Sequence, residues 1–309
     1  MLRITNIGGF GNKIRISNGV VELDFSTSFG PRILRYALAG GKNFFYEDVD
    51  DLGKSEDKLI ENFGEGATWH NYGGHRLWQA PELLPRTYLP DNDEIKYELT
   101  DTGVILYQKA FDYTKTVAKI EIVMSKDKPD VKVIHTVKNL SPWEVTFSPW
   151  TISVMARDVI EAVPVNKRDT GLLHNQGITV WPYTKLNDPR VYFGNEYITL
   201  RQDSSVEGKF KLGFTNENGF AAVFNGEAAF VKTFDYHKDA NYPDTGMNFE
   251  TYTDPVILEC ESLGRLQTLK EGEELTHTEN WTIIPNVTIK DQKDEETISK
   301  VLSHLRKDK

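Results

Sequence analysis

Two segments of the chain collect residue types that can do chemistry on a small molecule. The first is NYGGHRLWQAPE, residues 71–82, which gathers Asn71, His75, Trp78 and Glu82 around a pair of glycines. Glycine tolerates positive φ and allows a ligand to approach the backbone closely. An imidazole, a carboxylate and a large ring beside such a turn suit a polar binding site. A loop that plugs one end of a sheet structure, with Trp78 as its cover, is the alternative that the residues leave open.

The second segment is YHKDANYPDTGMNFETYTDP, residues 236–255. In an extended NFETY, side chains alternate between two faces, so Asn248, Glu250 and Tyr252 share one face. An amide, a carboxylate and a phenol on one face can read the hydroxyls of a polyol. The same pattern is also that of an ordinary half-exposed strand, and both interpretations stay open.

A third candidate is the carboxylate pair in VILECES, where Glu259 and Glu261 point to one face and Leu258 and Cys260 to the other. Two carboxylates held close together raise the pKa of one of them, which then retains a proton to donate. If that face is wet, the two glutamates are only the exposed side of a strand.

The sequence contains no general motif for a cofactor or a metal. It has no phosphate-binding glycine loop, no paired-cysteine zinc spacing, no His-Glu-x-x-His helix and no Gly-x-Ser-x-Gly elbow. Aromatic and acidic residues dominate instead. Sugars suit such a surface, because their C–H faces pack on aromatic rings while Asp, Glu, Asn, Arg and Lys bond their hydroxyls. We therefore expect a small carbohydrate as ligand and neither a metal nor a cofactor.

Charge and cysteine content limit which partners and which cellular compartment the sequence is compatible with. The 309 residues carry 36 Lys and Arg against 46 Asp and Glu, a formal charge of −10, and no basic cluster precedes the final HLRKDK. Nucleic-acid binding, which needs a basic face, is disfavoured. No segment has the apolar length of a signal peptide or a membrane span. With a single cysteine, Cys260, we expect a cytoplasmic protein, whose oligomeric state the sequence does not indicate.

Along the chain, apolar and polar residues mostly alternate with a period of two, and this pattern predicts about fifteen strands. The clearest runs cover residues 19–25, 94–99, 103–113, 117–124, 131–137, 177–183, 190–201, 210–214, 219–224, 228–236, 255–263 and 279–285.

Helical patterns are few. Residues 57–63 can form a turn or two, and the stretch 291–309 contains one amphipathic helix, acidic at its start and basic at its end. These patterns predict an all-β protein, a large antiparallel sandwich or barrel, in one domain over residues 1–309. Residues 46–90 are predicted as one long loop with a functional role.

Several quoted segments together resemble the galactose mutarotase-like (aldose 1-epimerase-like) superfamily. The opening NGVVELDFSTSFGPRILRYALAGGKNFFYE, the corner VKVIHTVKNLSPWEVTFSPWTIS and the closing LKEGEELTHTENWTI resemble the corresponding family segments. The ordered set YGGHRLWQAPE, WPYTKLNDPR, FKLG, FVKTF, YPDTGMNFETYTDP and LECESLG is similar to one branch of that superfamily. The resemblance covers roughly residues 10–285.

This resemblance implies a β-supersandwich with a sugar-binding groove on its concave sheet. It also implies aldose 1-epimerase-type chemistry without a metal or cofactor, in which a Glu acts as base on the anomeric hydroxyl and a His as acid on the ring oxygen. The family His follows the Asn-x-Ser corner, but this chain has FSPWTISVMARD there, with Trp150 and no histidine. The family Glu corresponds to Glu250, Glu259 or Glu261, of which Glu250 fits best.

Two hypotheses follow from the resemblance. The first is an enzyme with Glu250 as base and His75 as acid, with Lys232, Lys211 and Tyr242 as other candidate acids. Its ligand would be a sugar or, because lysines and an arginine are among the candidates, an anionic sugar derivative. The proposed ligand-binding residues are Arg32, Asn71, Trp78, Glu82, Trp150, Lys211, Lys232, Tyr242, Asp244 and Asn248. The second hypothesis, motivated by the missing family His, is a carbohydrate-binding protein of the same fold without turnover.

Overall fold

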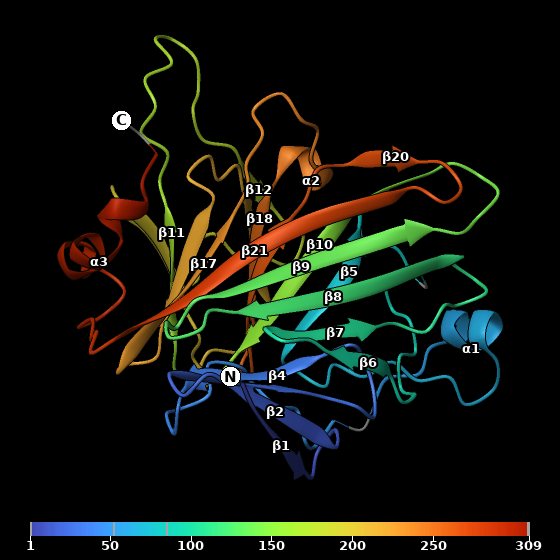
Figure 1. Cartoon of the computed structure of the whole chain (residues 1–309). Helices are drawn as coiled ribbons and strands as arrows, with labels where there is room; N and C mark the ends of the chain where they lie inside the picture. Colours follow the sequence, from blue (N-terminus) through green and yellow to red (C-terminus); the bar gives the residue numbers. More distant parts are fainter. Residues whose placement is uncertain (1, 52, 85, 308–309) are drawn as a thin grey trace.

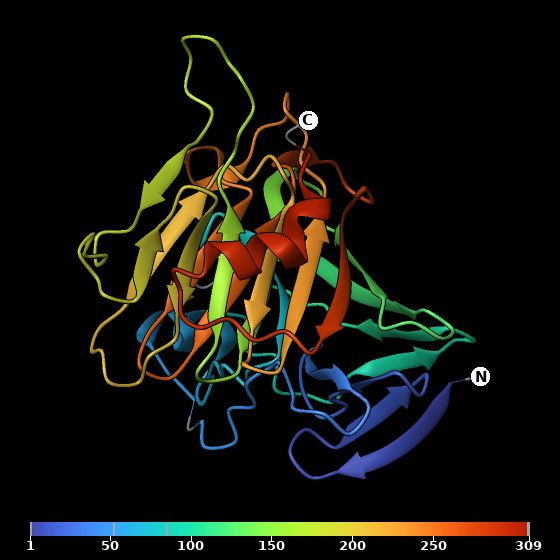
Figure 2. The same cartoon turned by 90° about the vertical axis from the view of Figure 1, so that its left-hand side faces the viewer.

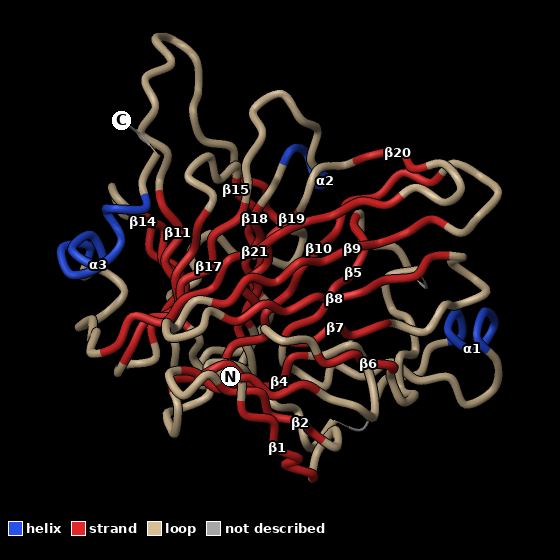
Figure 3. Tube along the Cα trace, in the orientation of Figure 1, coloured by secondary structure: helices blue, strands red, loops and turns tan. Residues whose placement is uncertain are grey.

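Two large antiparallel β-sheets make up most of the molecule (Figure 1). The structure is a computed structural model and describes residues 2–51, 53–84 and 86–307. Helices lie only at the periphery, as the tube in Figure 3 shows, so the predicted all-β class is confirmed. No helix within the described part of the chain is long and apolar enough to cross a membrane.

The first sheet has eleven strands in the order β1-β2-β3-β4-β5-β10-β19-β18-β15-β12, with β20 added on β10. These strands are β1 (Arg3–Gly8), β2 (Lys13–Ser17), β3 (Val21–Phe25), β4 (Ile33–Leu38), β5 (His75–Ala80), β10 (Val145–Met155), β12 (Ile178–Val180), β15 (Phe210–Phe214), β18 (Phe249–Thr253), β19 (Leu258–Leu263) and β20 (Gln267–Leu269).

The second sheet has ten strands in the order β13-β14-β11-β16-β17-β21-β9-β8-β7-β6. They are β6 (Lys96–Leu99), β7 (Gly103–Tyr107), β8 (Thr116–Met124), β9 (Val131–Asn139), β11 (Ile160–Pro164), β13 (Val191–Phe193), β14 (Tyr197–Arg201), β16 (Phe220–Phe224), β17 (Ala228–Phe234) and β21 (Glu274–Pro285). The helices are α1 (Asp57–Phe63), α2 (Pro243–Gly246) and α3 (Glu295–Leu302), followed by the 3₁₀ turn η1 (Ser303–Leu305).

The main hydrophobic core lies between the two sheets. It joins buried side chains of β3, β15 and β18 in one sheet with those of β7, β8, β9 and β21 in the other. A second apolar cluster forms on the outer face of the ten-stranded sheet, where α3 lies across the strands (Figure 2). Ile298 and Leu302 of α3 are fully buried there, and the Asp294 side chain caps the helix by accepting from the Thr297 N–H. The predicted C-terminal helix therefore shields this face from water.

The segment that the sequence analysis treats as the centre of a long loop is an interior strand. β5 lies between β4 and β10, and the described residues of 46–90 outside β5 and α1 are mostly loop. A strand covered on both faces has no alternation of polar and apolar residues, so a pattern search misses it. Because side chains alternate along a strand, a residue of β5 can contribute to a site on one side of the sheet only. His75 and Arg76 are neighbours in sequence but project to opposite sides.

The backbone before β5 passes so close to Tyr46 and Ile33 that Gly73 and Gly74 leave no room for a side chain. Gly73 and Gly74 have φ values of +73° and +68°, and a Cβ at Gly74 would lie 2.4 Å from the carbonyl oxygen of Ile33. The Gly74 N–H donates to the Tyr46 carbonyl, and the Gly74 carbonyl accepts from the Val154 N–H. The pair thus fixes where β5 enters the sheet.

We expect Gly74→Ala to destabilise the fold by more than the roughly 1–2 kcal/mol that a left-handed conformation costs a residue with a side chain. The excess comes from the collision with Ile33. The matched control is Gly272→Ala, because Gly272 has a φ of +80° but nothing within 4 Å of its Cβ position. Urea unfolding of both variants checks this, and equal losses would mean that the close approach to Ile33 is unimportant.

Candidate functional site

A cavity of about 910 Å³ opens on the face of the eleven-stranded sheet that points away from the core. Its floor consists of outward-facing side chains of β5, β10, β15, β18 and β19, and its walls are loops around residues 48–59, 81–88 and 181–183. Strand pairing aligns the floor, since Trp78 lies opposite Trp150 and Tyr252 lies between Lys211 and Glu259. The cavity is large enough for a small organic ligand.

Aromatic side chains form much of the cavity wall. Trp78 is the centre of the group: its ring lies 5.6 Å from Trp69, 5.1 Å from Tyr88 and 5.4 Å from Trp150, measured between centroids. The other aromatic lining residues are Trp181, Tyr183 and Tyr252. Such a wall offers flat apolar faces beside polar groups, the combination on which a sugar ring packs.

A buried charge cluster lies directly beneath the cavity. Lys211 lines the cavity, and its Nζ is 2.8 Å from Glu250 Oε2 and 3.0 Å from Glu261 Oε2. The two carboxylates are 1% and 0% exposed and lie directly opposite each other on β18 and β19. Trp150 Nε1 also donates to Glu261 Oε2 at 2.7 Å. One oxygen of each carboxylate, Oε1, has no hydrogen-bond partner among the described residues.

The environment of this cluster favours a shared proton. Burial raises the pKa of Glu250 well above its usual value, the Glu261 charge raises it further, and Lys211 opposes both. Burial likewise raises the pKa of Glu261, again against Lys211. Although burial opposes a charged lysine, the two carboxylates hold the pKa of Lys211 well above normal. Glu261 has two close donors, Lys211 and Trp150, whereas Glu250 has Lys211 alone, so the surroundings favour the protonated form more at Glu250.

A second polar group projects into the cavity from β5. The guanidinium of Arg76 lies 4.3 Å over the Trp78 ring and donates to Glu259 Oε1 at 2.9 Å and to Asn71 Oδ1 at 3.0 Å. Arg76 is therefore held rigidly, with its charge neutralised by Glu259. Its planar fork can bond a ligand only in the geometry that these partners leave open.

The cavity as a whole is acidic. Among the described lining residues, carboxylates outnumber cations seven to four. The two cations at the centre, Lys211 and Arg76, are already paired with glutamates. The negative field of the cavity would therefore repel an anionic ligand, but it would not repel a neutral or cationic one.

Backbone strain occurs at the edge of the cavity in α2. Asp244, which lines the cavity, has φ of 50°, and Thr245 has φ of 68°. The left-handed conformation is unfavourable for a β-branched residue, and such strain gathers at functional sites. The hydroxyls of Thr245 and Thr179 bond each other at 2.7 Å and help to hold the turn.

Six of the residues expected in the site do line the cavity: Asn71, Trp78, Glu82, Trp150, Lys211 and Asp244. Glu82 accepts a hydrogen bond from the Tyr88 hydroxyl, which fixes its carboxylate at the wall. Glu250 does not line the cavity itself but contacts Lys211, which does. Together these residues come from four distant parts of the sequence.

The other expected residues lie elsewhere and serve the fold. His75 is fully buried on the inner face of β5, bonded to Ser153 and His135, while Glu250 faces the opposite side of the sheet. This corrects the expected pairing of Glu250 with His75, because the two cannot act on one ligand. Lys232 is also fully buried between the sheets, 2.9 Å from Glu279.

Three further corrections concern expected ligand-binding residues. Arg32 is 2% exposed and forms an ion pair with Asp91 at 2.6 Å. The Asn248 side chain holds the backbone of Asn216 through two hydrogen bonds. The Tyr242 hydroxyl accepts from the His237 N–H, and its ring stacks on Tyr236. In each case the side chain is bonded to another part of the protein, and none of the three lines the cavity.

Arg76 was not among the residues expected in the site, and the sequence left the burial of Glu261 open. Arg76 is two residues from Trp78, so once residues 75–80 are placed in a strand, alternation puts both on the cavity face. Glu261 is fully buried rather than on a wet strand face, whereas Glu259 lies at the cavity. The signal for Glu261 was the lysine of FKLG, but only the strand order shows that β15 lies beside β18, with β19 on the other side of β18.

The fold is that of galactose mutarotase-like proteins. A galactose mutarotase-like protein from Lactobacillus casei superposes with a TM-score of 0.54 at 10% identity, covering 88% of this chain and 99% of that one. A galactose mutarotase related enzyme from Lactobacillus acidophilus gives 0.51 at 10% identity, covering 89% and 98%. The sequence-based prediction of this β-supersandwich is thereby confirmed.

A larger protein contains the same fold. A TPR-domain containing protein from Parabacteroides distasonis matches with a TM-score of 0.59 at 12% identity over 88% of this chain, and the match spans about half, 47%, of that protein. No family model matches the sequence, and a search of the curated proteins gives no match. At this level of identity the similarity concerns the fold, and a function has to be inferred from the residues of the site.

Removing the cation from the buried cluster tests its electrostatics. We expect Lys211→Met to lower the free energy of unfolding at neutral pH by about 3–5 kcal/mol, because two buried carboxyls lose the cation that pairs with both of them. Both carboxyl pKa values then rise further. A raised carboxyl pKa stabilises the fold below its unfolded value, near 4.5, and that stabilisation is lost as pH rises through the folded pKa.

The destabilisation by Lys211→Met should therefore be smaller at pH 5 than at pH 8. Urea unfolding of variant and wild type at both pH values measures it. Lys209→Met is the matched control, because Lys209 is exposed at the rim of the same cavity. A loss independent of pH would show that the two carboxyls do not depend on Lys211.

Proposed function

We propose that this chain binds a small neutral sugar in the cavity and catalyses aldose 1-epimerase-type interconversion of its anomers. The observation that carries the proposal is the proton-sharing cluster of Lys211, Glu250 and Glu261 under a tryptophan-lined cavity. A fold shared with galactose mutarotase-like proteins supports it. The cytoplasmic location expected from the sequence stays a prediction.

The charge distribution favours a neutral ligand over an anionic one. The idea of an anionic sugar rested on Arg32, Lys211 and Lys232. Two of these cations are buried in other ion pairs, and Lys211 is paired with two glutamates. A ring stacked on Trp78 would place its hydroxyls among Asn71, Glu82 and Asp244.

The chemistry needs one group to take the anomeric proton and another to protonate the ring oxygen. Glu259, an ionisable carboxylate at the cavity, takes the base role that the family resemblance assigns to a glutamate. Lys211 donates to the ring oxygen, and the protonated Glu250 behind it restores the lysine proton. Ring closure with the opposite face of the carbonyl reverses both transfers and gives the other anomer.

Glu250→Gln and Glu259→Gln should each slow the interconversion by about 100-fold or more, the usual contribution of a general acid or base. Exchange spectroscopy by NMR on neutral aldohexoses measures the rate directly. Glu161→Gln is the matched control: Glu161 is fully buried but lies on β11 of the other sheet. Wild-type protein that raises no sugar's rate above the uncatalysed one would exclude the enzyme.

Binding without turnover is the second candidate function, because the histidine expected to act with Glu250 faces the opposite side of the sheet. Under this proposal the cavity still binds a sugar, and the buried cluster only maintains its shape. Thermal stabilisation by a sugar without anomer exchange would favour it.

A binding test distinguishes the ligand classes. We expect neutral sugars to raise Tm while glucuronate does not, since the cavity field is negative. Trp78→Ala should weaken binding roughly tenfold by removing the stacking surface. Trp143→Ala is the control, because Trp143 is 76% exposed and lies outside the cavity. A larger shift with glucuronate than with glucose would contradict the neutral-ligand proposal.

A further inference from the structure

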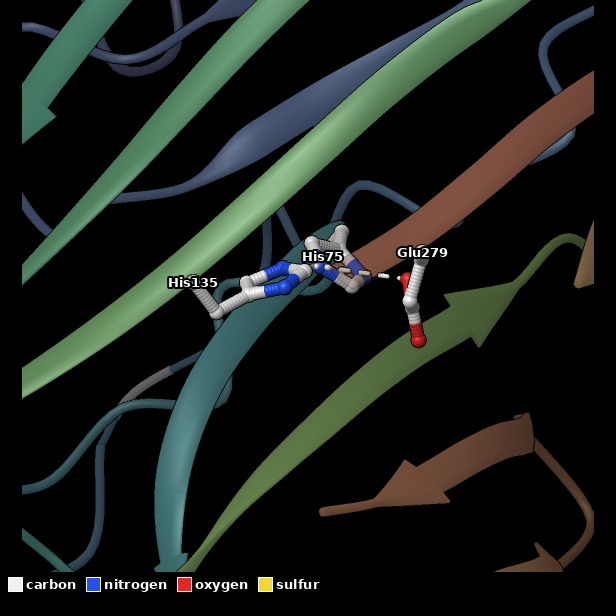
Figure 4. A group of neighbouring side chains, drawn as sticks. All are labelled: His75, His135 and Glu279. Atoms are coloured by element: carbon white, nitrogen blue, oxygen red, sulfur yellow. Dashed lines mark hydrogen bonds and ion pairs between the residues drawn. The ribbon is translucent and has the colours of Figure 1, made fainter. Parts of the chain in front are cut away.

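Three side chains that can bind a metal converge between the two sheets, on the opposite side of β5 from the cavity. His75 of β5, His135 of β9 and Glu279 of β21 are each fully buried and point toward one another (Figure 4). His75 Nε2 lies 2.7 Å from His135 Nε2 and 3.8 Å from Glu279 Oε2, and all three ligand atoms fall within 4.8 Å of one another. To bind one ion at metal–ligand distances near 2.0–2.2 Å, the two ring nitrogens would move apart and the Glu279 carboxylate would move closer to them.

The second nitrogen of His135 is anchored in the way that metal-binding histidines are. His135 Nδ1 lies 3.1 Å from the His277 carbonyl oxygen. A carbonyl only accepts, so Nδ1 carries the proton and Nε2 presents its lone pair toward His75 and Glu279.

His75 can adopt the required tautomer without releasing a proton. Its Nδ1 lies 2.9 Å from Ser153 Oγ, and a hydroxyl can either donate or accept. Without a metal, His75 Nε2–H donates to His135 and Ser153 donates to Nδ1. With a metal on Nε2, the proton moves to Nδ1 and Ser153 accepts it, so every polar atom keeps a partner in both states.

Glu279 is held as a carboxylate by a set of donors. Its Oε1 accepts from Thr151 at 2.6 Å, Ser262 at 2.7 Å and Lys232 at 2.9 Å. Its Oε2 accepts from Trp281 Nε1 at 2.7 Å and faces His75. A carboxylate oxygen has two lone pairs, so Oε2 has one left to bind an ion.

We propose that His75, His135 and Glu279 bind one divalent first-row metal ion, for which zinc is the best match. Two neutral imidazoles and one carboxylate are a ligand set that zinc accepts, with ligands on rigid strands and their outer atoms already bonded. The ion would join the two sheets, because β5 belongs to one and β9 and β21 to the other. This site is separate from the proposed sugar cavity and does not depend on it.

The buried carboxyl of Glu161 can offset the added charge. Neither of its oxygens meets the hydrogen-bond geometry with a described partner, and it lies close enough to Lys232 for their charges to interact. Its pKa is raised by burial to about 8, so it is mostly protonated at neutral pH in the absence of a metal. Ionisation of Glu161 would offset one of the two positive charges that the ion adds near Lys232.

The test uses full-length protein expressed in zinc-supplemented medium and purified without chelator. We expect about one zinc per chain by elemental analysis, and expression in cobalt medium should give the visible bands of a tetrahedral cobalt site. His135→Gln should lose at least tenfold of the bound metal. His277→Gln is the matched control, because the His277 side chain bonds Ser262 and lies outside the three-ligand set, while its backbone carbonyl remains.

Wild-type protein is decisive even if His135→Gln does not fold. Less than about one tenth of an equivalent of zinc, without cobalt bands, would mean that the cluster is only a hydrogen-bonded core. Equal metal in His135→Gln and wild type would place the ion elsewhere and would also overturn the proposal. Zinc-loaded wild type should in addition show a higher Tm than chelator-treated protein, as expected when a ligand binds only the folded state.

Discussion

The alternation of side chains along the central strands of the eleven-stranded sheet organises the whole molecule. Both faces of β5, β10, β18 and β19 are covered, so successive residues enter different environments. Arg76 and Trp150 reach the cavity, whereas His75 and Thr151 reach the space between the sheets. A shift of one residue in strand pairing would exchange the two sets, and the cavity and the core network would be lost together.

Each side of this sheet contains a buried lysine that stabilises carboxylates. Lys211 neutralises Glu250 and Glu261 on the cavity side, and Lys232 bonds Glu279 on the core side. Buried ion pairs contribute little net stability, since desolvation offsets their attraction. Their effect here is on position and pKa: in the cluster beneath the cavity burial raises the pKa of Glu250, and in the core Lys232 holds the pKa of Glu279 well below its usual value.

The sequence was sufficient to predict the fold class and many of the cavity residues. It was not sufficient to predict which face of the sheet each side chain occupies. The pattern is clearest where burial alternates, as in β8, or where one face is apolar, as in α3. β5 lacks that contrast, so residues 75–80 looked like loop, and His75 was assigned to the wrong side. Arg32 and Asn248 looked like ligand-binding residues because their partners, Asp91 and Asn216, are close only in three dimensions.

The position of β21 within the ten-stranded sheet has a consequence for how the chain folds. β21 follows every other strand in sequence yet lies in the middle of the sheet, between β17 and β9. The two halves of the sheet therefore present unpaired inner edges until this strand inserts. Contacts of such long sequence separation form slowly, and open edges invite pairing with other chains. The strand that joins the two halves of this sheet is also the one that places Glu279 and Trp281 in the core.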